Sequence, residues 1–324
     1  LLSELPRDIV LLNWEYEQDG ANIARTKEIS ESGIPFMVCP GTSGWLTHGS
    51  RLPNSIANVA KFSAMGRKYN AKGLLNTDWG DNGHRNFLGV SLHGFAHGAA
   101  HSWHGKAVND ETFTEKFCAS FFEQKTNKLA QAMRLLGNTY ITCGKTVKNK
   151  SLLYAGLVEP LFKSGTGKSV SSSMYQPVYA WAGSPCHEPD AIDMMTEDGL
   201  NRILEQLSDA KIWPNPEKQT RKFESMALIE FALAARMDCL ACKRALVGKK
   251  LRSGQTIRKP ELKKLASQMQ VMSDDFKKLW LSRNKTSRLK DNLDLFKKVI
   301  QELERFAEKR ERTAPNNTTI YITP

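Results

Sequence analysis

Three short apolar runs in the first 80 residues indicate strands. They are Asp8–Trp14, Ile34–Cys39 and a third run that begins at Gly73. Continuous apolar runs of this length are typical of parallel strands that are fully buried. The two segments between them, Asn22–Ser32 and Asn54–Tyr69, carry apolar residues at helical spacing. The pattern therefore predicts three consecutive βα units with parallel strands and right-handed crossovers.

Downstream of the third strand the sequence changes to long helical patterns. Gly89–Gly105 is consistent with a helix packed on that strand. Helical periodicity then covers Glu111–Leu136, Glu188–Leu207, Glu217–Val247 and Glu261–Lys309. The predicted loops are Gly144–Lys150 and Lys163–Ser173, and residues 310–324 are a predicted tail or edge strand. We therefore predict an α/β domain at residues 1–105 and a helical C-terminal domain at residues 106–324.

Aromatic and ionisable side chains follow all three predicted strands. They are Trp14, Glu15 and Tyr16 after the first, Trp45 after the second, and Asp78, Trp79, Asp81 and His84 after the third. In (β/α) barrels the functional groups sit at the carboxyl ends of the strands. An indole can pack on the C–H face of a sugar ring, and carboxylates accept hydrogen bonds from its hydroxyls. The pattern indicates a sugar site, although a polar turn capped by an Asp would explain the third cluster without any function.

The charge of the chain is uneven along its length. The sequence has 46 basic and 34 acidic residues, a formal net charge of +12. Of these, 21 basic and 9 acidic residues lie between residues 241 and 312, which leaves 25 of each sign elsewhere. The excess therefore belongs to the C-terminal helices. Solvated helix faces explain it, and binding to nucleic acid, another acidic polymer or a membrane surface is the alternative.

Cysteine spacing offers one motif with possible chemistry. Six cysteines are scattered through the chain, which is not the pattern of a disulfide scaffold and favours a reducing compartment such as the cytoplasm. Cys239 and Cys242 have metal or redox spacing, but they lie in an apolar helical run and no second pair of this kind exists. We interpret them as buried helix cysteines. Gly165–Ser169 looks like a phosphate loop, but Phe162 stands where the first Gly is required.

Four histidines share one face of a predicted helix. His93, His97, His101 and His104 recur at helical spacing, and pairs four residues apart can bind zinc. No Asp or Glu occurs between Leu92 and Gly105 to complete such a site. We therefore interpret these residues as surface or hydrogen-bonded core histidines and predict no metal ligand.

The motifs at the three strand ends resemble those of a bacterial branch of glycoside hydrolase family 20, the β-N-acetylhexosaminidases. They are Leu11-Leu-Asn-Trp-Glu-Tyr16, Val38-Cys-Pro-Gly-Thr-Ser-Gly-Trp45 and Thr77-Asp-Trp-Gly-Asp-Asn-Gly-His84. The segment Leu279-Trp-Leu-Ser-Arg-Asn284 also resembles the helical tail of that branch. The resemblance covers nearly the whole chain. It implies an α/β fold comprising the last three βα units, strands six to eight, of a (β/α)8 TIM barrel, followed by a mainly helical C-terminal domain.

The resemblance also implies an activity. Family members release a terminal β-linked N-acetylhexosamine with retention, in a reaction assisted by the substrate's own acetamide group. An Asp-Glu pair at the end of the fourth strand holds that acetamide and acts as general acid and base. Here the pair would lie upstream of residue 1. Asp110-Glu111 follows the last strand and is expected to start a helix, so we do not assign it the catalytic role.

The sugar pocket can be carried over residue by residue. The resemblance implies that Trp79 lies under the pyranose ring and that Asp81 accepts hydrogen bonds from its O4 and O6 hydroxyls. Better-known branches have Glu in place of Asp81. Trp14 and Trp45 would line the acetamide pocket, and Tyr16 would hydrogen-bond the acetamide oxygen. The remaining residues of the expected substrate-binding set are Glu15, Asp78 and His84.

Two other classes of function remain open. The chain could be a carbohydrate-binding protein without catalysis, or a basic helical module that binds nucleic acid, which we consider the weaker alternative. The expected partner is a glycan or glycoconjugate ending in N-acetylhexosamine. A missing N-terminal half or a partner chain is expected to cover the open strand edge before Asp8. We expect no cofactor and no membrane span, and the sequence does not determine the localisation further.

Overall fold

The computed structural model describes residues 2–81, 84–161, 191–208, 213–218 and 221–309. Within these ranges the chain is mostly helical, and the only strands of the described part are two short parallel ones, β1 (Leu11–Trp14) and β2 (Phe36–Cys39). The prediction of three βα units of a TIM barrel is therefore wrong. The phosphate-loop-like segment, the predicted loop at Lys163–Ser173 and the tail at 310–324 lie outside the described residues.

The third predicted strand contacts β2 without forming a strand of its own. β1 and β2 pair in register from Leu11 with Phe36 to Trp14 with Cys39. The third run makes only two isolated parallel bridges, at Leu74 and at Thr77. Thr77 bonds to the carbonyl of Pro40 just after β2, whereas Asn76 Nδ2 donates to the carbonyl of Gly94 in α4, 2.8 Å away. The backbone of residues 72–77 still lies along β2, with hydrogen bonds such as that from Leu75 N–H to the carbonyl of Val38 at 3.0 Å.

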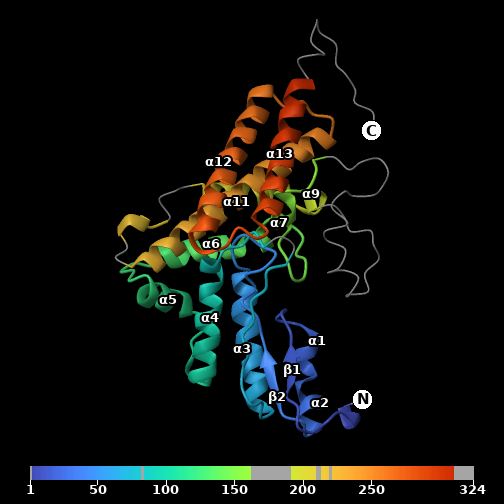
Figure 1. Ribbon diagram of the computed structural model, residues 1–324, viewed down its shortest axis with the longest axis vertical. Helices are drawn as coiled ribbons and strands as arrows, with labels where there is room; N and C mark the ends of the chain where they lie inside the picture. The colour runs from blue at the N-terminus through green and yellow to red at the C-terminus, as the bar shows by residue number, and fades with distance from the viewer. Residues whose placement is uncertain (1, 82–83, 162–190, 209–212, 219–220, 310–324) are drawn as a thin grey trace, which may run out of the picture.

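Helices cover one face of this small sheet. α1 (Ala21–Ala24), α2 (Thr26–Glu31) and α3 (Leu52–Lys68) lie beside it in Figure 1. Their shared core contains Ile23, Phe36, Val38 and Phe62.

The opposite face of the sheet is open. The first strand was expected to be fully buried, but Leu12 is 52 % exposed and Trp14 46 % exposed. Successive side chains of a strand point to opposite faces, so every second residue of β1 points away from the helices. Val10 and Leu75 are also exposed. Apolar side chains therefore line the uncovered face.

α4 (Leu88–Trp103) connects the strand region to the helical part of the chain. It packs on α3 at one side and on α11 (Lys222–Arg252) at the other, and Figure 1 shows it running between the two regions. The other described helices are α5 (Phe113–Phe121), α6 (Lys128–Thr142), α7 (Leu152–Gly156), α9 (Ala191–Met194), α10 (Glu197–Leu207), α12 (Lys259–Arg283) and α13 (Leu289–Lys309). Short 3-10 turns occupy Leu2–Glu4 (η1), Gly105–Ala107 (η2) and Pro216–Lys218 (η4).

The main core lies among the later helices. Phe231, Met237 and Cys242 of α11 are buried in it, and α11 contacts α7, α10 and α12. α12 and α13 pack side by side (Figure 1). No helix of the described ranges combines the length and the apolar character that a membrane crossing needs. The domain division at residue 105 stays a prediction.

Two of the long helical patterns break at positions that carry no strong helix-ending residue. Glu111–Leu136 was expected as one helix, but α5 and α6 are separated near Glu123, which has a φ of 54°. The run Glu261–Lys309 is split into α12 and α13 by a turn with Arg288 at a φ of 62°. Positive φ angles end a helix locally, and neither position is a glycine that would have marked the break.

Candidate functional site

Three indoles gather around Tyr16 at the carboxyl ends of the strands. The ring of Tyr16 is stacked on Trp14 with centroids 5.4 Å apart. It meets Trp45 edge-on at 5.0 Å and Trp79 at 6.3 Å. Aromatic pairs at these separations are mutually attractive. The structure therefore brings together four aromatic residues that come from three separate stretches of sequence.

The three indoles differ in what they can offer to a ligand. Trp14 and Trp79 are 46 % and 47 % exposed, whereas Trp45 is completely buried. The Nε1 group of Trp45 donates to Asn149 Oδ1 at 2.8 Å, in the helical part of the chain. Trp14, Tyr16 and Trp79 thus form a partly exposed surface, named here the aromatic platform, and Trp45 supports it from the core. The expected contact between Trp45 and an acetamide group stays a prediction.

A glycine makes the close packing under the platform possible. A β-carbon at Gly41 would lie 2.5 Å from Cη2 of Trp45 and 3.0 Å from Cδ1 of Tyr16. Real β-carbons do not approach other atoms as closely as the first of these distances. The backbone after β2 can therefore pass beneath Trp45 and Tyr16 only without a side chain at this position.

Asp78 is a structural group in this arrangement. Its Oδ1 accepts hydrogen bonds from the hydroxyls of Thr42 and Ser91, the latter at 3.0 Å. Burial raises the pKa of Asp78, and these two hydrogen bonds oppose the rise. The carboxylate thus ties the loop after β2 to α4.

Asp81 and His84 lie close together at the edge of the platform. Burial raises the pKa of Asp81, and the nearby His84 lowers it in part. Burial also lowers the pKa of His84, against the influence of Asp78 and Asp81. Asp81 also acts electrostatically on Tyr16. A half-buried carboxylate next to aromatic faces is suited to accept hydrogen bonds from sugar hydroxyls.

The tyrosine at the centre of the platform has its hydroxyl in a polar setting. Burial raises the pKa of Tyr16, while hydrogen bonds with the side chains of Thr77 and Trp79 lower it. The group therefore stays protonated at neutral pH and can donate a hydrogen bond. This is consistent with the expected role of Tyr16 as a donor to an acetamide oxygen, which stays a prediction.

Glu15, the other acid predicted to bind substrate, is largely engaged by the backbone. Its Oε1 accepts from the N–H groups of Tyr16 at 2.9 Å and Glu17 at 3.2 Å. Its Oε2 accepts from the N–H of Asn22 at 3.3 Å. The side chain therefore shapes the loop after β1, and a ligand would compete with these bonds.

Two asparagines of α3 hold the platform loop, and the sequence reasoning missed both. Asn54 Nδ2 donates to the carbonyl of Tyr16 at 2.7 Å. Asn58 Nδ2 donates to the carbonyl of Glu15 at 2.9 Å, and its Oδ1 accepts from Gly41 N–H at 3.1 Å. Asparagine is a poor helix former. Two asparagines one turn apart in a predicted helix were therefore a usable signal for a positioning role.

The helical region also reaches the site. The ring of His84 meets Trp280 of α12 edge-on at 6.1 Å. The carbonyl of Asp81 accepts from the hydroxyl of Tyr154 in α7 at 3.4 Å. Groups far apart in sequence thus fix the turn that carries Asp81.

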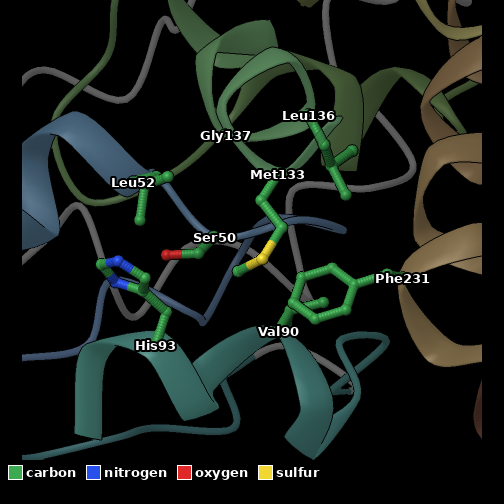
Figure 2. Close-up of a pocket in the computed structure, with 8 residues that line it drawn as sticks. All are labelled: Ser50, Leu52, Val90, His93, Met133, Leu136, Gly137 and Phe231. Carbon is green, nitrogen blue, oxygen red and sulfur yellow. The ribbon is translucent and has the colours of Figure 1, made fainter. Parts of the chain in front are cut away.

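A small cavity lies elsewhere, between α3, α4, α6 and α11 (Figure 2). Its lining is mainly apolar and consists of Ser50, Leu52, Val90, His93, Met133, Leu136, Gly137 and Phe231. Figure 2 shows His93 and Ser50 as the polar side chains that point into it. It shares no residue with the platform, and we assign it no ligand.

The cysteines of the helical pair are buried and reduced in α11. Cys239 and Cys242 are free thiols, as are Cys39, Cys118 and Cys143. Burial raises the pKa of Cys239 to about 11 and that of Cys242 well above its usual value. Thiols that stay protonated at neutral pH are poor nucleophiles and poor metal ligands. The sixth cysteine, Cys186, lies outside the described residues.

Comparisons with known proteins identify no family for this chain. The chain matches no protein-family model, and a search of curated proteins finds no match to it. The resemblance to glycoside hydrolase family 20 therefore stays a prediction that rests on the three strand-end motifs.

Proposed function

We propose that the aromatic platform binds the terminal N-acetylhexosamine of a glycan, as the sugar-binding surface of a β-N-acetylhexosaminidase-like glycoside hydrolase. The observation that carries the proposal is the convergence of two exposed indoles, a tyrosine hydroxyl and the carboxylate of Asp81 at one edge of the sheet. Exposed indoles are costly to leave in water, and a sugar covers them with C–H groups while its hydroxyls find acceptors nearby.

Each part of the sugar has a matching group. The faces of Trp14 and Trp79 offer surfaces for the pyranose ring and the acetamide methyl group. Asp81 accepts from ring hydroxyls, and the Tyr16 hydroxyl donates to the acetamide oxygen. A sugar without the acetamide group would lose the hydrogen bond from Tyr16 and the methyl contact with the indole faces.

The alternative is a carbohydrate-binding protein without catalysis. The carboxylates of Glu15 and Asp78 accept internal hydrogen bonds. Of the three predicted acids near the platform, Asp81 is therefore the one whose carboxylate is left for a ligand. Hydrolysis requires a proton donor at the glycosidic oxygen. Asp110 and Glu111 follow α4 and do not join the aromatic platform; Asp110 bonds to His97 and His101 instead. The hydrolase proposal therefore assigns proton transfer to groups outside the platform.

Calorimetric titration with methyl β-N-acetylglucosaminide tests the binding. Trp79→Ala removes a stacking face worth about 1–3 kcal/mol, so we expect affinity to fall about five- to 150-fold. Trp103→Ala is the matched control, because Trp103 is 85 % exposed at the end of α4 and outside the platform. Equal affinity of the Trp79→Ala variant and the unmodified chain would overturn the proposal.

Release of a phenol from an aryl β-N-acetylglucosaminide separates the two functions. We expect the 324-residue chain to bind this substrate without turning it over, since no carboxylate pair faces the platform among the described residues. Turnover by the chain alone, lost in Asp81→Asn but not in Asp110→Asn, would place the proton donor on the platform. If the chain binds the substrate but does not hydrolyse it even in a cell lysate, the non-catalytic alternative would be favoured.

A further inference from the structure

The histidines of α4 form a cluster that the sequence could not complete. His97 and His101 are buried on one face of the helix, at 0 % and 5 % exposure. After α4 the chain turns back through η2, where Gly105 has a φ of 55°. This turn brings Asp110 against both imidazole rings. Oδ1 of Asp110 lies 2.7 Å from Nε2 of His97 and 2.8 Å from Nε2 of His101.

We propose that His97, His101 and Asp110 form a binding site for a divalent transition-metal cation, with Zn²⁺ as the best fit. One ligand atom of each residue lies within 4.8 Å of the others. Two imidazole nitrogens and one carboxylate oxygen suit zinc and its first-row neighbours, while Mg²⁺ and Ca²⁺ prefer oxygen alone. Histidines four residues apart on a helix present both nitrogens to one ion.

The carboxylate has the freedom that metal binding requires. Ligands about 2.0–2.1 Å from zinc in a tetrahedral site lie about 3.3 Å apart, so Asp110 must move outward by roughly half an ångström from its present hydrogen bonds. Its side chain is 36 % exposed and belongs to a turn, so that shift disturbs no packed core. The same exposure leaves a fourth coordination position open toward water.

Neighbouring groups support the two histidines unequally. Nδ1 of His101 lies 3.1 Å from the hydroxyl of Ser63 in α3, which can accept an N–H there and so direct the Nε2 lone pair to a metal. Nδ1 of His97 is buried and has no hydrogen-bond partner among the described residues. A metal on Nε2 places the His97 proton at that unpartnered position. We therefore expect the affinity to be about ten- to a hundredfold lower than with both histidines supported in this way.

The ring of Phe113 closes the site on its inner side. It meets the ring of His97 at a centroid distance of 4.8 Å. Such an apolar wall holds the imidazole in place and keeps bulk water from one side of the cluster. Of the three ligands, Asp110 is by far the most exposed to solvent.

The test uses the full chain after a chelator has removed bound metal. The chain is titrated with Zn²⁺ in competition with a chromophoric chelator, and Mg²⁺ is the negative control. We expect one Zn²⁺ per chain and a higher melting temperature with the metal. Asp110→Asn keeps a hydrogen-bond acceptor and removes the charge, so affinity should fall at least about tenfold. His101→Gln should do the same, with circular dichroism to show that the helices remain.

Two control variants change ionisable residues that are near the proposed ligands in sequence. Glu111→Gln removes an exposed carboxylate beside Asp110, and His104→Gln removes an exposed imidazole beside the site. Both should keep the affinity within about twofold of the unmodified chain. Co²⁺ then reports the ligand type, because visible bands without thiolate charge-transfer absorption indicate nitrogen and oxygen ligands.

Three results would overturn the metal site. One is the absence of Zn²⁺ binding up to millimolar concentration, which would make the cluster a set of hydrogen bonds to Asp110 only. The second is unchanged affinity in both ligand variants. The third is a thiolate band with Co²⁺, which would place the ion on cysteines instead.

Discussion

At the residue scale, the carboxylates near the platform have separate tasks. Glu15 accepts three backbone N–H groups, and Asp78 accepts two hydroxyls. Both lock loops in place. Asp81 has its carbonyl bonded to Tyr154, while its carboxylate stands half-buried beside His84. Sequence spacing could place these acids near one another, but it could not say which of them is engaged internally.

Asp81→Asn tests the role of that carboxylate. The substitution keeps the shape and removes the charge, and hydrogen bonds to a charged group contribute about 1.5–3 kcal/mol. We expect affinity for methyl β-N-acetylglucosaminide, measured by calorimetry, to fall about ten- to a hundredfold. The loss should shrink for a sugar without O4 and O6 hydroxyls. Asp78→Asn should instead lower the melting temperature. If Asp78→Asn selectively lost sugar affinity, the sugar contact would belong to Asp78 and not to Asp81.

At the element scale, the sequence predicted more local structure than topology. The apolar runs that end at Trp14 and Cys39 are strands, and α3 and α4 lie where helical spacing placed them. The third run bonds to β2 through its backbone but forms only isolated bridges, and Asn76 and Asp78 also bond to α4, contacts that periodicity does not contain. The return of Asp110 to the face of α4 is another such contact. Hydrogen bonds of this kind bring Asp110 to the histidines, and a periodic sequence pattern does not predict them.

Gly41→Ala tests whether the close packing beneath the platform holds its shape. Overpacking a filled site costs about 1–3 kcal/mol, so we expect that loss in the free energy of unfolding in urea, together with weaker sugar binding. Gly73→Ala is the control. A β-carbon there would meet only Cε of Met37, at 3.2 Å, and the end of that flexible side chain can move. Equal stability of the two variants would show that the Trp45 and Tyr16 rings are not fixed by this glycine.

At the scale of the whole molecule, a buried polar network joins the strand region to the helices. Nδ1 of His48 lies 2.8 Å from Oδ1 of Asp238 in α11, and Thr139 in α6 lies 2.7 Å from Oδ2 of the same carboxylate. The His48 ring also packs against Tyr154, over which Arg85 lies. Charged and titratable groups from three segments, Asp238, Tyr154 and Arg85, therefore act on His48.

This network makes stability depend on pH. Burial lowers the pKa of His48 below its usual 6.5, with Asp238 opposing the shift and Arg85 adding to it. The unfolded chain therefore takes up a proton that the folded chain does not. Stability falls as pH drops through 6.5 and stops falling, for this group, below the folded pKa.

His48→Asn removes the titration and keeps an N–H donor near Asp238. We expect the variant to be less stable than the unmodified chain at pH 7. Its free energy of unfolding in urea should fall less steeply between pH 6.5 and 5, by up to about 1.4 kcal/mol per pH unit. Parallel pH profiles of the two proteins would show that His48 is charged in the folded state.

The central claim is that a sugar covers the exposed indoles at the strand ends. The seven tryptophans each give one indole N–H resonance in a ¹⁵N-correlated NMR spectrum, and single Trp→Phe variants assign them. Titration with methyl β-N-acetylglucosaminide should shift the resonances of Trp14 and Trp79 in a saturable way, while those of Trp103 and Trp213 stay in place. Shifts confined to Trp103 or Trp213, or none at all at millimolar sugar, would contradict the account.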